Sequence, residues 1–265
     1  MKLSAKIAVA AALGLGAANA FATISLPTSG NGTLMLSLFS NSDDTPFSYA
    51  FDTGLTFNSL TPTFLSTPGT TTFNLTGLAT DLASAAGQAA LSNLVFDVTA
   101  SAQTGGVATA GGFHLDTTFA PSVSLATITS IQSGAINSAV GTDNSFLSNF
   151  GATNPSFTTS PTAENYLNAT YNSQLNTFAV NAAAGVGNSL AFYQLANNRG
   201  TSSPGQTPVV YAGTWSVNLT NDTLSYTVPS SAVPLPPSVW LMVSGLAGVA
   251  ILGRRRKDGK SAVAV

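Results

Sequence analysis

The strongest structural signal in the sequence is the segment 215–228, which reads WSVNLTNDTLSYTV. On both sides of the polar stretch 220–223, apolar residues alternate with Ser, Thr and Asn, which is the pattern of half-buried strands. The stretch 220–223 itself contains side chains that tolerate tight turns. We therefore predict a β-hairpin with one apolar face, formed by the following residues: Trp215, Val217, Leu219, Leu224, Tyr226 and Val228.

Upstream segments show similar alternation. Leu34, Leu36 and Leu38 lie at strand spacing, and a short apolar run at 48–51 is followed by the turn-like Asp52-Thr53-Gly54. Further apolar residues follow Pro68-Gly69, a dipeptide typical of turns. Several short strands separated by turn signals predict a mainly β domain, sandwich-like, with one or two helical inserts.

Two segments are typical of helices. Residues 81–91 are rich in Ala, with Thr80 as the N-cap. A second helix is predicted to begin at Ser160-Pro161, since apolar residues follow at near-helical spacing. These are Leu167, Tyr171, Leu175 and Phe178. The Gly-rich stretch 105–112 and residues 197–208 are predicted to be loops.

Charge is scarce and unevenly placed. The chain has 265 residues, of which 7% are charged, against about 25% in an average soluble protein. Between the two ends there is one basic residue, Arg199, beside nine acids. Nucleic-acid binding is excluded because phosphates would lack cationic partners. The sequence contains no Cys, which excludes a disulfide scaffold, a thiolate zinc site and a cysteine nucleophile.

The amino-terminal residues 1–20 have the form of a secretory signal. Lys2 and Lys6 precede an apolar, Ala-rich run, and small residues stand at Ala18 and Ala20. These features predict cleavage before Phe21 and export of the chain. The expected structure of this segment is a signal helix.

The carboxyl-terminal region combines a proline motif, an apolar run and a basic cluster. The motif is Val233-Pro234-Leu235-Pro236, and residues 238–253 carry no charge. A helix of that length reaches roughly 24 Å, close to the thickness of a bilayer core. The cations that follow should stay in the cytoplasm by the positive-inside rule, and they are Arg254, Arg255, Arg256 and Lys257. We predict a transmembrane helix that anchors the chain from outside to inside.

This tail resembles the PEP-CTERM sorting signal, in the variant whose motif reads Val-Pro-Leu-Pro. The resemblance covers residues 233–257; Leu235 replaces the Glu of the name-giving motif, and Pro237 stands where Ala is usual. It implies that the chain is a substrate of an exosortase, a membrane-embedded transpeptidase-like cysteine protease. It also implies a Gram-negative bacterium that makes exopolysaccharide.

The sequence therefore predicts four parts. Residues 1–20 are the signal peptide, 21–232 a secreted β-rich domain, 233–257 the sorting signal and 258–265 a cytoplasmic tail. The expected location is the cell surface or the extracellular space, reached through the inner membrane after a transient membrane-anchored stage.

Candidate catalytic residues are few. His114 is the single histidine, and Asp116 on the same strand face could orient its imidazole, but no Gly-x-Ser-x-Gly supplies a nucleophile. A pair of carboxylates could hydrolyse a glycosidic bond, although most acids occur in turn-like compositions. The acids considered are Asp43, Asp44, Asp52, Asp97, Asp143 and Glu164.

No catalytic, cofactor-binding or metal-binding residue is assigned from the sequence. We expect no cofactor, with calcium as the alternative, because loop Asp and Asn oxygens suit a hard cation. The leading hypothesis is a non-catalytic surface or matrix protein, associated with exopolysaccharide within a biofilm. The alternative is a secreted carbohydrate-active enzyme that uses a carboxylate pair.

Overall fold

The hairpin at 215–228 is present in the computed structural model of the chain. Strand β9 (Val209–Asn218) pairs with β10 (Thr223–Val228), and Trp215 lies opposite Tyr226. The turn begins one residue earlier than predicted, at Leu219, and Asp222 has a left-handed φ of 48°. Asp tolerates that conformation better than most residues. The prediction of this hairpin is confirmed.

The structure describes residues 24–40, 44–150, 154–164, 166–167 and 183–230. Its other strands are β1 (Thr33–Ser40), β2 (Ser48–Thr56), β3 (Gly69–Asn74), β4 (Leu94–Gln103), β5 (Phe113–Phe119), β6 (Ser156–Thr158), β7 (Ala184–Gly185) and β8 (Ser189–Ala196). Its helices are α1 (Pro62–Ser66), α2 (Leu78–Ala83), α3 (Ala85–Ala90), α4 (Leu125–Thr129) and α5 (Ser133–Asn149), with short 3-10 turns at Pro27–Ser29, Phe57–Ser59 and Leu91–Asn93.

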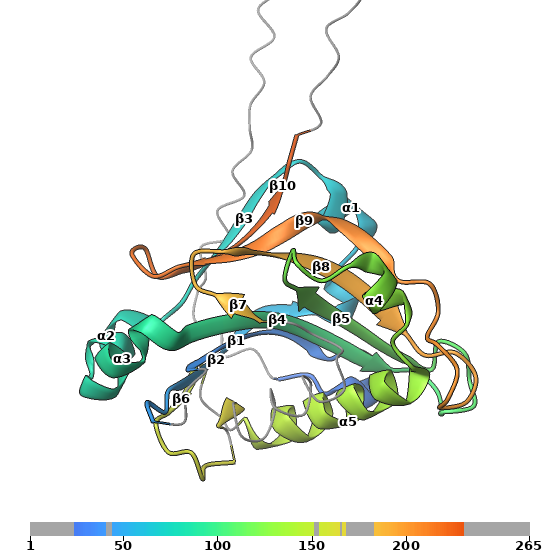
Figure 1. Cartoon of the computed structure of the whole chain (residues 1–265), viewed down its shortest axis with the longest axis horizontal. Helices are drawn as coiled ribbons and strands as arrows, with labels where there is room; N and C mark the ends of the chain where they lie inside the picture. The colour runs from blue at the N-terminus through green and yellow to red at the C-terminus, as the bar shows by residue number, and fades with distance from the viewer. Residues whose placement is uncertain (1–23, 41–43, 151–153, 165, 168–182, 231–265) are drawn as a thin grey trace, which may run out of the picture. The chain divides into compact units, whose positions relative to one another are not determined.

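The strands form one antiparallel sheet, in the order β3-β10-β9-β8-β5-β4-β1-β2-β6, with β7 beside β4 (Figure 1). The predicted mainly β fold is confirmed. The described strands belong to one continuous sheet instead of the two separate sheets of a sandwich. Layered packing still arises, because the sheet curls and its two halves face each other.

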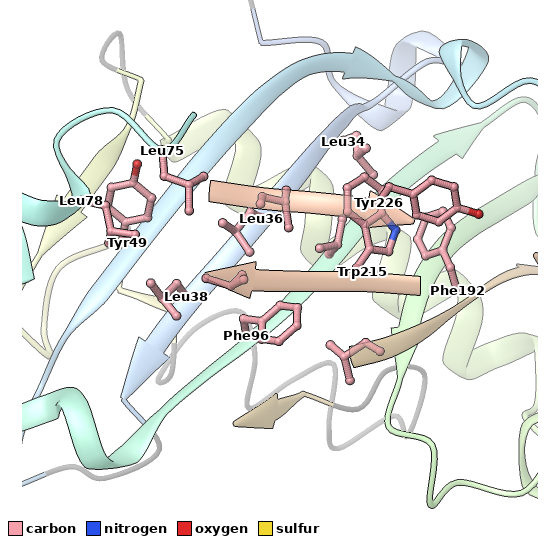
Figure 2. Close-up of a cluster of buried hydrophobic side chains, with 14 of the residues drawn as sticks. Leu34, Leu36, Leu38, Tyr49, Leu75, Leu78, Phe96, Phe192, Trp215 and Tyr226 are labelled. Carbon is pink, nitrogen blue, oxygen red and sulfur yellow. The ribbon is translucent and has the colours of Figure 1, made fainter. Parts of the chain in front are cut away.

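The concave side of the curled sheet encloses one hydrophobic core. Leu34, Leu36 and Leu38 of β1 share a cluster with Trp215 and Tyr226, although β1 and β10 are not neighbours in the sheet. Figure 2 shows these side chains converging from the two halves. The predicted apolar face of the strand at residues 34–38 is therefore confirmed.

The convex side of the sheet is covered by α5, which contacts β4, β5 and β8 (Figure 1). Ile136 and Val140 of α5 pack with Met35 and Leu115, which point out of the sheet on this side. All eight residues of β1 are consequently buried. A strand buried on both faces must be apolar or well hydrogen-bonded on both.

The predicted helix at 81–91 is present in a different form. Two short helices replace it, because Ser84 ends α2 and caps α3 by accepting a hydrogen bond from the Gly87 amide. Thr80 lies inside α2, and Gly77 occupies the N-cap position, so the predicted cap is wrong. Residues 161–164 form turns, and the rest of the second predicted helix lies mostly outside the described residues.

The structure corrects two further local predictions. Asp52-Thr53-Gly54 does not end its strand, since β2 continues to Thr56 through an irregularity opposite β1. The stretch 197–208 is a loop as predicted, but Asn197 is fully buried there and accepts a hydrogen bond from the Phe113 amide. The Gly-rich stretch 105–112 is also a loop.

The structure does not test the two targeting signals predicted at the ends of the chain. The signal peptide, its cleavage residues and the sorting signal at 233–257 lie outside the described residues. Within the described ranges, no helix is long and apolar enough to cross a membrane. The first compact unit of the chain ends at Pro229.

Candidate functional site

Four acids among the described residues are buried: Asp52, Asp97, Asp116 and Asp143 have exposed fractions of 3%, 0%, 0% and 1%. Asp116 lies on a strand as predicted, and Asp97 lies in β4, whereas the turn placement predicted for Asp52 and Asp143 is wrong, because Asp52 lies within β2 and Asp143 within α5. The composition of residues 141–144 (Gly-Thr-Asp-Asn) is typical of a turn, but these residues are helical. Asp44 and Glu164 are exposed in turns, and Asp43 lies outside the described residues.

Asp116 occupies the concave side of β5 and is hydrogen-bonded to a tyrosine. The Tyr211 hydroxyl donates to Asp116 Oδ1 at 3.1 Å. Burial raises the pKa of Asp116 to about 8, although the hydrogen bonds from Tyr211 and Gln194 act in the opposite direction. At neutral pH this side chain is therefore mostly a neutral acid.

His114 does not form the expected pair with Asp116. Its ring lies against Phe57, with 5.6 Å between ring centroids, and burial lowers its pKa, partly offset by a hydrogen bond with the Gly111 backbone. The buried Nδ1 atom has no hydrogen-bond partner among the described residues. The two side chains share a strand face as predicted, but no hydrogen bond joins them.

A second buried polar group lies between the sheet and α5. The Ser101 hydroxyl of β4 donates to Asp143 Oδ2 of α5. Asp97 of β4 points to the same side of the sheet by strand alternation and lies opposite Ser37 of β1. The exposed fractions of these acids are at most 1%. Because a glycosidase carboxylate must contact its sugar, neither acid can act on a substrate in this conformation.

Asp52 acts as a local backbone partner. Its Oδ1 atom accepts from the Gly54 amide at 2.7 Å, while the Asn154 side chain pairs with the Asp52 backbone at 3.0 and 2.9 Å. Burial raises the pKa of Asp52, and the Gly54 hydrogen bond partly offsets this. In the described parts of the chain, no three His, Asp or Glu residues gather into a metal-binding group.

The exposed feature of the domain is an array of hydroxyl side chains on the convex side of β8, β9, β10 and β3. We call it the hydroxyl face, and it consists of Thr70, Thr72, Ser189, Thr214, Ser216, Thr223, Ser225 and Thr227. Its members are exposed or half-buried. Adjacent rows are hydrogen-bonded, with Thr70 3.1 Å from Thr227 and Thr72 3.4 Å from Ser225.

The hydroxyl face follows from the same alternation that predicts the hairpin. Trp215 and Tyr226 point into the core, so Ser216 and Ser225 between apolar neighbours must point outward. Strand spacing places such side chains roughly 4.8 Å apart across the sheet and about 7 Å apart along it. The pairing of β3 with the hairpin is a long-range contact that the local alternation does not predict.

No protein-family model, curated protein or solved structure matches this chain. Any functional assignment therefore depends on the residues themselves. In the described residues, the four buried acids have exposed fractions of at most 3%, whereas the hydroxyl face is regular, uncharged and open to solvent.

Proposed function

We propose that the chain is an exported cell-surface or extracellular-matrix protein that an exosortase-type protease sorts, and that its role is structural instead of catalytic. The observation that carries the proposal is the order of signals in the tail. The motif 233–236, the uncharged run 238–253 and the cations 254–257 follow one another in a chain that begins with a secretory signal.

The hydroxyl face supports an association with extracellular polysaccharide. Its Ser and Thr side chains both donate and accept hydrogen bonds, as sugar hydroxyls do. The regular strand spacing repeats these groups along two directions, which suits a polymer with a repeating unit. The absence of charge among the outward residues of these four strands permits contact with a neutral glycan.

The length of the connection between domain and tail fits a tethered sorting substrate. β10 ends at Val228, and the uncharged run begins at Ser238. The intervening residues 229–237 span at most about 30 Å when extended. The motif 233–236 lies within this connection in the sequence.

The basic cluster provides a test of this proposal. Replacing Arg254, Arg255, Arg256 and Lys257 with Gln should release the chain from surface retention, because these cations hold the inner end of the apolar run in the cytoplasm. Fractionation followed by immunodetection would measure the amount in membrane, surface and medium. Lys260→Gln is the matched control, since it removes a cation outside the cluster. Unchanged localisation of the cluster variant would contradict the proposal.

A further inference from the structure

Strand β3 forms one margin of the sheet and leaves a row of backbone groups open. It pairs with β10 along its whole length, from Gly69 to Asn74, without a bulge. The same ladder continues one step further, where the Leu75 amide donates to the Asp222 carbonyl at 2.8 Å. Directly opposed residues of two antiparallel strands alternate between pairs that exchange backbone hydrogen bonds and pairs that do not. Odd-numbered residues of β3 therefore bond to β10, and Thr70, Thr72 and Asn74 direct their amide and carbonyl groups outward.

The side-chain hydrogen bonds of β3 support the conclusion that even-numbered residues direct their backbone groups outward. Thr70 and Thr72 hydrogen-bond through their hydroxyls to Thr227 and Ser225, the residues directly opposite. Such side-chain contacts are favoured at non-bonded pairs, where the Cα atoms approach to about 4.5 Å. In the described part of the chain, the outward backbone groups of Thr70, Thr72 and Asn74 have no protein partner. They are exposed, so water solvates them.

This margin lacks the features that usually prevent strands from pairing between molecules. Natural edge strands are short, or carry Lys, Pro or a bulge. β3 has six residues, which read GTTTFN and include no charge and no proline. The opposite margin is different, because β6 has only three residues.

We propose that β3 pairs antiparallel with β3 of a second copy of this chain, with Thr72 at the twofold axis. In that register Thr72 faces the partner's Thr72 and Thr70 faces the partner's Asn74, so all outward groups meet in about six backbone hydrogen bonds. Thr71 lies across from the partner's Phe73 on the inner side, a favourable β-branched and aromatic pair. On the outer side the two hydroxyl faces join into one continuous surface.

The charge distribution does not oppose a second copy at this edge, because β3 carries no charge. The nearest acid in the hairpin is Asp222, beside the Asn74 end of β3. Antiparallel pairing places that end next to the partner's Thr70, so the two acids lie at opposite ends of the shared strand pair. The interaction is self-complementary, as a twofold interface requires, and it does not depend on how the tail is sorted.

Thr72→Cys tests the pairing, because the chain contains no other cysteine. Opposed residues in a bonded pair have Cα atoms about 5.5 Å apart, within the range of a disulfide. Oxidation of the full chain in mild detergent should convert most Thr72→Cys protein to a covalent dimer on non-reducing gels. Ser216→Cys, on the same face but two strands from the edge, is the control and should stay monomeric.

A mixture of two variants tests the register. Thr70→Cys alone should not form dimers, whereas Thr70→Cys mixed with Asn74→Cys should form mixed dimers. Thr72→Glu should reduce the dimer measured by light scattering, since it places like charges at the axis. A monomeric Thr72→Cys after oxidation, equal cross-linking of Ser216→Cys, or a dimer unaffected by Thr72→Glu would each overturn the proposal.

Discussion

Replacing Trp215 by Ala should lower the free energy of unfolding by about 3–5 kcal/mol. The indole is fully buried and lies beside the rings of Tyr226 and Phe192 (Figure 2). The ring centroids are 4.8 Å apart for Trp215 and Tyr226 and 5.8 Å for Trp215 and Phe192, and a third ring, Phe73, lies at 6.1 Å. Domains of this size have free energies of unfolding of about 5–15 kcal/mol, so the Trp215→Ala substitution alone should remove a large share of the stability. Urea unfolding followed by circular dichroism would measure it.

Two variants at neighbouring positions make this test specific. Ser216→Ala alters the adjacent outward residue and should change stability by less than about 0.5 kcal/mol. Trp215→Phe keeps a ring in the cluster and removes the indole N–H, which is buried without a partner among the described residues. Its cost should therefore be well below that of the Ala variant. Wild-type stability in Trp215→Ala would contradict the role of the hairpin in the core.

The domain should be more stable at pH 5 than at pH 8, because Asp116 keeps its proton in the folded state. Its pKa is about 8 in the fold against 3.8 for the ordinary side chain. Between these values unfolding releases a proton, so stability falls as pH rises. The slope approaches about 1.4 kcal/mol per pH unit for one such group. The midpoints of urea unfolding at several pH values would report it.

Asp116→Asn is the matched variant for this pH dependence. The Asn amide is neutral and similar in shape, so stability should change less with pH and should exceed that of the wild type at pH 8. Burial also raises the pKa of Asp52 and lowers the pKa of His114, and these two shifts contribute to the pH dependence of stability with opposite signs. Equal slopes for wild type and variant would show that Asp116 is ionised in the folded domain.

The sequence predicts the local parts of this fold well. The hairpin at 215–228 and the strand containing Leu34, Leu36 and Leu38 are specified by alternation alone, and turn residues fix their ends. The path of the sheet depends on long-range pairing instead. Nothing in the segment 69–74 indicates that β10 is its neighbour, and a single curled sheet and a sandwich require the same alternation.

Helix α5 was missed because its composition opposes its structure. The segment 133–149 is rich in Ser, Asn and Gly, which are poor helix formers. A helical signal does exist, since Ile136, Val140, Asp143 and Leu147 recur at spacings of three and four and are all buried. Asp143 interrupts the apolar pattern. An acid can be buried at this position because its carboxylate accepts a hydrogen bond from the Ser101 hydroxyl of a distant strand.

The buried acids were missed for a related reason. Acids are almost never fully buried unless paired, so turn-like neighbours predict loops. Here the hydroxyls of Tyr211 and Ser101 each donate a hydrogen bond to one carboxyl oxygen of a buried acid, in a domain with one basic residue, the exposed Arg199. Such partners come from remote strands and have no signature near the acid in the sequence.

Mapping the tryptic peptides of the mature surface protein tests the sorting proposal most directly. After signal removal, trypsin can cut only after Arg199 before it reaches Arg254. We expect two peptides: one from Phe21 to Arg199, and one that starts at Gly200 and ends near the motif 233–236. Mass spectrometry would identify both termini. A peptide that extends from Gly200 through the apolar run to Arg254 would contradict cleavage of the tail.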